Sequence, residues 1–289
     1  MSDSKDYPIE WEIARMNKYI KKIINLPKRI EREIETRKYK NDKYAGILQI
    51  RNVEESLSYI EQNEVSFYRY GDGEIAIMLG CDIPFQKADE KLQKRLIELL
   101  SIKEEGIEVA IPYYYFNYEH GLIGMVESFA YAMKEQRRFL LEHCRKDYTY
   151  LDTSISQIYQ SYEEYDFEQY FHRVKALFKG RKVTLICGKG IFQNLQYNLL
   201  EECEIVEYLD APSKNAFSEY DDILQKAKRI PKDHLVCIVL GPTAKPLAYD
   251  LHKEGYQAWD MGHFLKDYDA FCKKRSRDEE SITEFYKPD

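Results

Sequence analysis

The chain has 289 residues, of which 44% are hydrophobic and 32% charged, and its formal net charge at pH 7 is -7. This composition excludes a disordered chain, which would be poorer in apolar and aromatic side chains. The acidic balance argues against broad nucleic-acid binding, which needs many basic side chains to displace counterions, although local basic patches stay open. The six cysteines are scattered without a C-x-x-C pair, which predicts reduced thiols in a cytoplasmic protein.

Residues 1–45 are predicted to form a helical extension at the N-terminus. Apolar and basic residues recur at helical spacing from Trp11 to Asp42. This segment contains ten Lys and Arg residues but only five Asp and Glu residues. One interpretation docks this basic segment on a partner transferase or on the inner face of a membrane, which would make the protein peripheral. The other packs it against the main domain or against a second subunit of a homo-oligomer. The sequence shows no signal peptide and no apolar stretch that spans a bilayer.

Residues 46–275 are predicted to form the main domain, and residues 276–289 a C-terminal tail. Short β-branched runs alternate with helical runs, which predicts an α/β fold with a Rossmann-like, mainly parallel sheet flanked by helices. Residues 147–178 are rich in Tyr and acidic residues and follow neither pattern. The expected strands are 65–70, 106–112, 182–188, 203–210, 234–241 and 256–262, and the expected helices are 87–102, part of 122–144, 191–202, 219–230 and 244–255.

The loop "GDGE", residues 71–74, follows the first of these strands, and ligands bind beyond the carboxyl ends of parallel strands. An Asp-Gly between two apolar runs is also a hairpin signal. In extended backbone, Asp72 and Glu74 would project to one side, and their oxygens would suit Mg²⁺ or Mn²⁺. Gly73 would let a ligand approach, and Arg69 would hold a carboxylate or a phosphate. If the following residues are helical, Glu74 lies at a helix N-terminus that faces an incoming anion.

Two further loops carry candidate residues, each with a structural alternative. In "GPTA", Gly241 permits close backbone approach, Pro242 stiffens the loop and Thr243 offers a hydroxyl group, but a simple helix N-cap would use the same residues. Asn215 in "DAPSKNAF" would hydrogen-bond a base or a sugar, or would be a turn residue. The glycine loop "CGKG" lacks the third glycine of a dinucleotide-binding loop and is weak support for one.

The sequence does not identify the general base. His263 with Asp260 could perform acid-base chemistry, although a lone histidine is often structural. The aromatic stretch at residues 111–121 offers rings that stack on a sugar or a base. No arrangement of a nucleophilic serine or cysteine is recognisable.

Four stretches, taken in order, resemble the GT-D type of glycosyltransferase. They are "FYRYGDGEIAIMLG", "IPFQKADEKLQKRL", "APSKNAFSEYDDIL" and "VLGPTAKPLAYDLHKEGYQAWDMGHF", and the resemblance covers roughly residues 54–269. In that family a D-x-E motif binds a divalent metal that holds the diphosphate of a nucleotide-sugar donor. The resemblance therefore implies that Asp72 and Glu74 bind Mn²⁺ or Mg²⁺. Tyr70 stands where family members commonly have Phe, a mild departure.

By this resemblance we expect a metal-dependent glycosyltransferase that moves a hexose from a nucleotide-sugar donor, expected to be a UDP-hexose, to a glycan acceptor on a lipid or protein. Surface polysaccharide or glycoprotein assembly is the implied setting. Two other classes stay open: a metal-dependent hydrolase of a nucleotide or phosphate ester, and a non-catalytic binding or scaffolding protein that works through its basic segment. The candidate catalytic residues are Asp72, Glu74 and His263, and the candidate donor-binding residues are Arg69, Gly71, Gly73, Asn215, Gly241, Pro242 and Thr243.

Overall fold

The computed structural model describes residues 43–119 and 121–286, together with residues 30, 33, 34, 37 and 38. The predicted N-terminal extension, residues 1–45, therefore lies almost entirely outside the described residues. Every helix in the described part of the chain is too short or too polar to cross a membrane.

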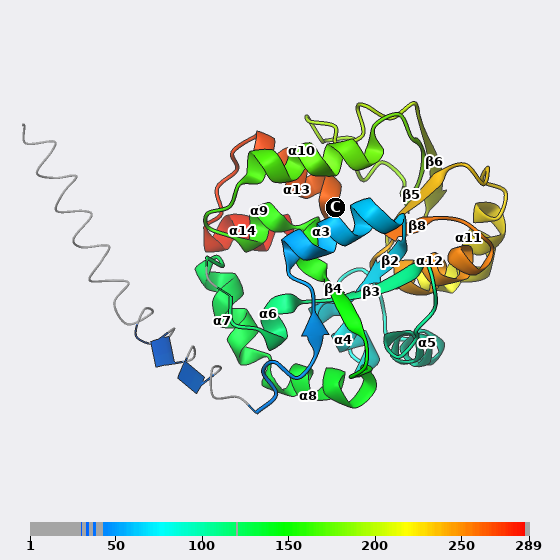
Figure 1. Ribbon diagram of the computed structural model, residues 1–289. Helices are drawn as coiled ribbons and strands as arrows, with labels where there is room; N and C mark the ends of the chain where they lie inside the picture. Colours follow the sequence, from blue (N-terminus) through cyan, green and yellow to red (C-terminus); the bar gives the residue numbers. More distant parts are fainter. Residues whose placement is uncertain (1–29, 31–32, 35–36, 39–42, 120, 287–289) are drawn as a thin grey trace, which may run out of the picture.

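The strands of the described residues form one eight-stranded sheet in which all neighbours are parallel, which confirms the predicted sheet (Figure 1). Their order across the sheet is β1-β4-β3-β2-β8-β7-β5-β6. Two strands were not predicted: β1 has two residues, and β4 lies in the stretch that followed no pattern. The bounds are β1 Gln49–Ile50, β2 Ser66–Arg69, β3 Ile107–Ile111, β4 Thr149–Asp152, β5 Lys182–Gly188, β6 Ile205–Ala211, β7 Leu235–Val239 and β8 Ala258–Asp260.

Helices connect these strands. The α-helices described are α3 Val53–Asn63, α4 Asp72–Met78, α5 Glu90–Leu100, α6 Tyr113–Phe116, α7 Gly124–Ala132, α8 Lys134–His143, α9 Ile158–Ser161, α10 Phe167–Phe178, α11 Tyr220–Ala227, α12 Ala244–Lys253, α13 Phe264–Cys272 and α14 Glu279–Phe285. Three short 3₁₀ helices are η1 Thr153–Ser156, η2 Ala216–Glu219 and η3 Gly241–Thr243. Residues 276–289, separated above as a tail, thus include α14, whose Ile282 and Phe285 are buried.

The helix expected at residues 191–202 is absent, because side chains accept hydrogen bonds from backbone N–H groups that a helix would use internally. Turns occupy this stretch instead. Asp269 of α13 accepts hydrogen bonds from the backbone N–H groups of Gln196 and Tyr197, and the Asn198 side chain accepts one from Leu200. Such side-chain contacts compete with helix formation.

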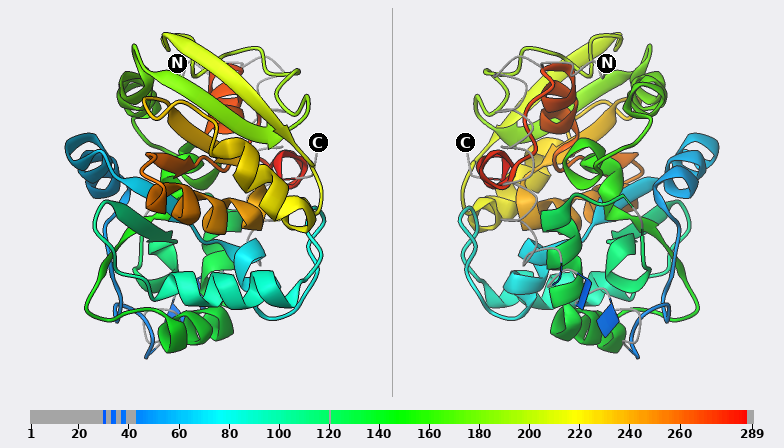
Figure 2. Two further views of the ribbon diagram at one scale, coloured as in Figure 1. Left: turned by 90° about the vertical axis from the view of Figure 1, so that its right-hand side faces the viewer. Right: turned by 90° about the vertical axis from the view of Figure 1, so that its left-hand side faces the viewer.

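Helices cover both faces of the sheet, as the side views in Figure 2 show. Successive side chains of a strand point to opposite faces. In β2, the Tyr68 hydroxyl donates to the Leu99 carbonyl of α5 at 2.8 Å, whereas the Phe67 ring lies 5.3 Å from that of Trp259, which contacts Phe178 of α10. The core therefore fills both sides of the central strands.

The order of the strands reverses between β2 and β8. The chain runs outward from β2 through β3 to β4 on one side, and β8, β7, β5 and β6 lie on the other side. Open parallel sheets bind ligands where the order reverses, beyond the carboxyl ends of the strands. The loop after β2 begins at this point, and it is the loop that carries "GDGE".

Candidate active site

"GDGE" leads from β2 directly into helix α4 and is not a hairpin. Gly71 is the N-cap of α4, and its backbone N–H donates to Oε2 of Glu74 at 2.8 Å. Asp72 and Glu74 lie in the first helical turn, so the expectation of an extended backbone with both carboxylates on one side is wrong, and the helical alternative is confirmed. Asp72 reaches solvent, whereas Glu74 points toward the protein interior.

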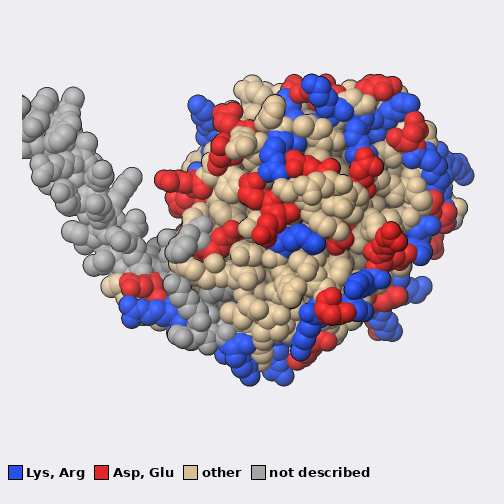
Figure 3. Space-filling model, viewed as in Figure 1, with Lys and Arg blue, Asp and Glu red and all other residues tan. Residues whose placement is uncertain are grey.

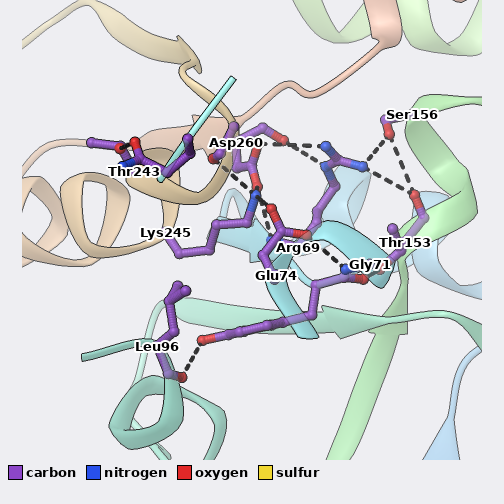
Figure 4. Close-up of polar contacts among 12 residues, drawn as sticks. Arg69, Gly71, Glu74, Leu96, Thr153, Ser156, Thr243, Lys245 and Asp260 are labelled. Atoms are coloured by element: carbon purple, nitrogen blue, oxygen red, sulfur yellow. Dashed lines mark hydrogen bonds and ion pairs between the residues drawn. The ribbon is translucent and has the colours of Figure 1, made fainter. Parts of the chain in front are cut away.

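The partner of Glu74 is Lys245, a residue that the sequence analysis did not single out (Figure 4). Lys245 lies in the first turn of α12, directly after η3, and only 2% of its surface is exposed. Its Nζ atom lies 2.6 Å from Oε1 of Glu74 and 3.1 Å from Oδ2 of Asp260. A lysine that follows "GPTA" was the available signal, but its two partners lie in helix α4 and strand β8, which are remote in the sequence.

Asp260, the last residue of β8, joins Lys245 to Arg69. The backbone N–H of Arg69 donates to Oδ2 of Asp260 at 3.1 Å, and Nε of Arg69 donates to the Asp260 carbonyl at 3.0 Å. Burial alone would raise the pKa of Asp260, but Lys245 and Arg69 lower it below its ordinary value. Asp260 is therefore an ionised, buried carboxylate with two cationic partners.

Arg69 holds a carboxylate, as expected, but it is that of Asp260 and not that of Asp72 or Glu74. Besides Asp260, its guanidinium donates to the Ser156 hydroxyl of η1 rather than to Asp72 or Glu74 (Figure 4). Gly262, with φ of +47°, makes room for this side chain, because a Cβ there would lie 1.5 Å from Nη2 of Arg69. Arg69 thus supports the site through Asp260.

Asp72 is the carboxylate of this set that forms no ion pair among the described residues. Although it is exposed, desolvation by the surrounding protein and the charge of Glu74 raise its pKa. The described residues contain no group of three or more His, Cys, Asp or Glu placed to hold a metal ion. Mg²⁺ in enzymes is commonly held by one or two carboxylates together with substrate phosphates. Asp72 is therefore a single exposed carboxylate beside a buried set of ion pairs, and the described residues form no preformed metal cage around it.

The structure brings the predicted donor-binding loops together on the loop at residues 81–88. Gly241 has φ of +52°, and a Cβ there would lie 3.1 Å from the Phe85 ring, while the adjoining Pro242 and Thr243 are buried in η3. The Thr243 hydroxyl donates to Oε1 of Gln86 at 3.4 Å. Gly73 belongs to the same region, because a Cβ at this position would be in ordinary contact with Ile83.

Asn215 is a turn residue that hydrogen-bonds to the same loop, residues 81–88. Its φ is +53°, its backbone N–H donates to the Phe85 carbonyl at 2.8 Å, and its Oδ1 accepts from the backbone N–H of Lys87 at 2.8 Å. The side-chain oxygen is thus committed to joining two loops. The structural alternative left open by the sequence accounts for these contacts.

His263 lies at the start of α13 in an environment that disfavours the predicted catalytic role. Its ring packs against Phe285 and Tyr286 of the C-terminal segment, with centroids 5.4 and 5.1 Å away. Burial, followed by the charges of Arg69 and Lys266, lowers the pKa of His263 to about 3. A ring with so low a pKa is neutral and a weak base at neutral pH.

Comparison with known proteins identifies the family and the fold of the chain. The family model described as "Glycosyltransferase GT-D fold" matches residues 67–284. The chain is 28% identical over 226 residues to the "Probable glycosyl transferase Gly" of Streptococcus gordonii; the match covers 78% of this chain and 33% of that protein, so the chain spans about a third of the relative's length.

Two solved structures have the same fold. One, described as "The highly conserved domain of unknown function 1792 has a distinct glycosyltransferase fold", has a TM-score of 0.75 and 30% identity, covering 84% of this chain and 91% of that one. The other, "A New Glycosyltransferase (DUF1792) from Streptococcus sanguinis", has a TM-score of 0.74 and 26% identity over 81% of this chain and 92% of that one. The chain therefore belongs to the glycosyltransferase family with the GT-D fold.

Proposed function

We propose that this chain is a metal-dependent hexosyltransferase that takes a hexose from a nucleotide-sugar donor, a UDP-hexose, and transfers it to a glycan acceptor. The observation that carries the proposal is Asp72, which forms no ion pair with the described residues and lies beside a buried set of charges where the strand order reverses. The site contains three carboxylates (Asp72, Glu74 and Asp260) and only two cationic side chains, Lys245 and Arg69, so its formal charge is negative. A divalent cation would offset the excess negative charge.

Each side chain has a role in this proposal. Asp72 would hold Mn²⁺ or Mg²⁺, with Glu74 beside it, and the metal would neutralise charge on the diphosphate as the bond to the sugar breaks. Lys245 keeps Glu74 in a fixed orientation and supplies a buried positive charge close to where a diphosphate would lie. Asp260 forms an ion pair with Lys245 and is itself held by Arg69, so these groups need little rearrangement when the donor binds.

The proposed setting follows from the class of acceptor. A glycan carried on a lipid or protein during surface polysaccharide or glycoprotein assembly would be glycosylated in the cytoplasm, at the inner face of the membrane. The basic segment at residues 1–45, which lies outside the described residues, would bring the chain to that surface or to a partner transferase.

Thermal unfolding with UDP, with and without Mn²⁺, tests the donor site. Asp72→Asn should abolish the Mn²⁺-dependent stabilisation by UDP. The matched control is Asp221→Asn, because Asp221 is also an exposed residue in the first turn of a helix. UDP at about 100 times its dissociation constant should stabilise the natural chain by roughly 2.7 kcal/mol, a shift of several degrees at most.

Two results would contradict the proposal. If UDP with Mn²⁺ stabilises Asp72→Asn as much as the natural chain, Asp72 does not hold the metal. If UDP-hexose is consumed equally fast with and without any glycan acceptor, the chain is a hydrolase that uses the same carboxylates.

A further inference from the structure

A groove lies at the β1 edge of the sheet, and the charged residues around Lys245 are not among its lining residues. This open groove of about 740 Å³ runs between β1, one side of α3 and α6. This volume is within the range of ~300–1,000 Å³ that is usual for ligand sites. Figure 3, drawn in the same view as Figure 1, shows mostly uncharged surface below α3.

The side chains that line the groove suit a ligand rich in hydroxyl groups. Four carry amides and two carry phenol rings: Gln49, Asn52, Gln62, Asn117, Tyr59 and Tyr113. An amide both donates and accepts hydrogen bonds, as a sugar hydroxyl does. A tyrosine ring offers a flat apolar face and a polar tip, which matches the CH face and the hydroxyl rim of a pyranose.

Charge at the groove is balanced, which disfavours an anionic ligand. The guanidinium of Arg51 is held 4.0 Å above the Tyr59 ring, and its Nη1 donates to the Thr149 carbonyl at 2.7 Å. Glu55 supplies the opposite charge and is fixed in the capping box of α3 with Asn52. The Tyr59 hydroxyl donates to Glu108 at 3.0 Å, so this wall is ordered before any ligand binds.

Tyr113 connects the groove with a buried cluster of polar side chains. Its backbone N–H donates to Oδ1 of Asp152 at 3.1 Å. Oδ2 of Asp152 is buried without a hydrogen-bond partner among the described residues, and the neighbouring Glu119 and Tyr162 lie close enough to change each other's pKa. Burial, and then the charges of Glu119, Glu55 and Asp152, raise the pKa of Tyr113, so its hydroxyl lies in the field of both the groove and the cluster.

An unpaired buried polar atom is rare and calls for an explanation, such as water or a ligand group. Here the neighbouring Glu119 has mixed donor and acceptor character. Burial, followed by the charge of Asp152, raises the pKa of Glu119 to about 7 against the opposing effect of the Tyr162 hydroxyl, so near neutral pH this carboxyl group is protonated part of the time and can donate or accept.

The same region is joined to the donor loop. Thr153 follows Asp152, and its hydroxyl donates at 2.7 Å to the carbonyl of Tyr70, which precedes Gly71 and Asp72. Tyr113 follows Pro112, just beyond the carboxyl end of β3. Because β2 and β3 are parallel, this is the same edge of the sheet at which Asp72 lies. Tyr113, at one end of the groove, therefore lies at the same edge of the sheet as the proposed donor site.

We infer that this groove is the acceptor site of the enzyme and binds a neutral oligosaccharide, with Tyr113 and the four amides contacting the sugar rings. The inference rests on the proposed glycosyltransferase activity and names the class of its acceptor. It assigns to the β1 edge a binding function separate from the Asp72 site.

Methyl NMR of the full chain tests the inference. Leu48 and Ile50 line the groove, whereas Ile75 is buried directly after Glu74, so their methyl signals report the two sites separately. Chitohexaose, cellohexaose and maltohexaose at millimolar concentration are the probes for the groove, and UDP with Mn²⁺ is the probe for Ile75. We expect at least one hexasaccharide to shift Leu48 and Ile50, and to bind more tightly than its monosaccharide.

Two variants and a control complete the test. Tyr113→Ala removes a ring from the wall and should weaken hexasaccharide binding by about tenfold. Gln62→Trp fills the groove from its exposed rim and should weaken binding at least as much. Tyr208→Ala is the matched control, because Tyr208 is 61% exposed on β6 at the opposite edge of the sheet.

The outcomes separate the two claims. If Ile75 responds to UDP with Mn²⁺ but no hexasaccharide shifts Leu48 or Ile50, the acceptor groove is wrong and the proposed donor site stands. If the hexasaccharide shifts persist equally in Tyr113→Ala and Gln62→Trp, the sugar binds elsewhere and the inference is also wrong. If Ile75 does not respond to UDP with Mn²⁺, the proposed donor site fails instead.

Discussion

The Nζ atom of Lys245 lies 2.6 Å from Oε1 of Glu74, and 3% and 12% of the two side chains are exposed. Lys245 also lies 3.1 Å from the buried Oδ2 of Asp260. The ammonium group of Lys245 in α12 thus links the first turn of α4 to the end of β8. Removing the partner of a buried charge leaves that charge without compensation, which is far more costly than breaking an exposed pair.

Lys245→Met should therefore lower the free energy of unfolding by about 3–5 kcal/mol, because Glu74 and Asp260 would both lose their ammonium partner. The matched control is Lys226→Met. Lys226 lies 2.6 Å from Asp222, but both side chains are more than half exposed, and such pairs contribute at most about 1 kcal/mol. Urea unfolding measures both variants, and equal losses would show that Lys245 is not the centre of the buried set.

Gly262→Ala should be strongly destabilising, because its Cβ would overlap the Arg69 guanidinium. Gly255→Ala is the control for backbone strain. Gly255 also has a positive φ, +85°, but a Cβ there meets nothing within 4 Å, so this variant should cost only about 1–2 kcal/mol. A larger loss for Gly262→Ala, measured by urea unfolding, is the expected result; equal losses would mean that Arg69 moves aside easily.

His263→Gln should retain transferase activity within about tenfold of the natural chain, because a buried neutral ring with a pKa of about 3 is a poor base. Asp72→Asn, assayed alongside with Mn²⁺ and UDP-hexose, should lose far more. A loss of ~10²–10⁴-fold in kcat for His263→Gln in a folded protein would restore His263 as the general base.

Because of the buried Asp267, the free energy of unfolding should decrease as pH rises. Burial raises its pKa to about 8, although the backbone N–H groups of Tyr159 and Gln160 and the charge of Arg277 oppose this. The native state thus keeps a proton that the unfolded chain releases above its ordinary pKa of 3.8. The contribution of Asp267 is complete below that value and is lost progressively until about pH 8.

Asp267→Asn should remove this slope, which is up to about 1.4 kcal/mol per pH unit. Urea unfolding between pH 5 and 8 compares the variant with the natural chain. An unchanged slope in the variant would show that another group is responsible.

Much of the fold and part of the site could be predicted from the sequence, because the signals are local. The alternation of β-branched and helical runs predicted the parallel sheet, and the ordered stretches around "GDGE" and "GPTA" predicted the family that the comparison confirmed. Local patterns failed for β1, which has two residues, and for residues 191–202, where contacts with the distant Asp269 replace a helix.

By itself, the sequence determined which loops follow which strands, and therefore that Asp72, Glu74, Gly241 and His263 lie beyond the carboxyl ends of parallel strands. Only the tertiary structure decided which of these side chains meet. It paired Glu74 with Lys245, directed Arg69 to Asp260, and placed His263 against two rings of the C-terminal segment. The reason is physical: periodicity and caps depend on neighbours in the chain, whereas ion pairs and desolvation depend on strands and helices that are remote in sequence.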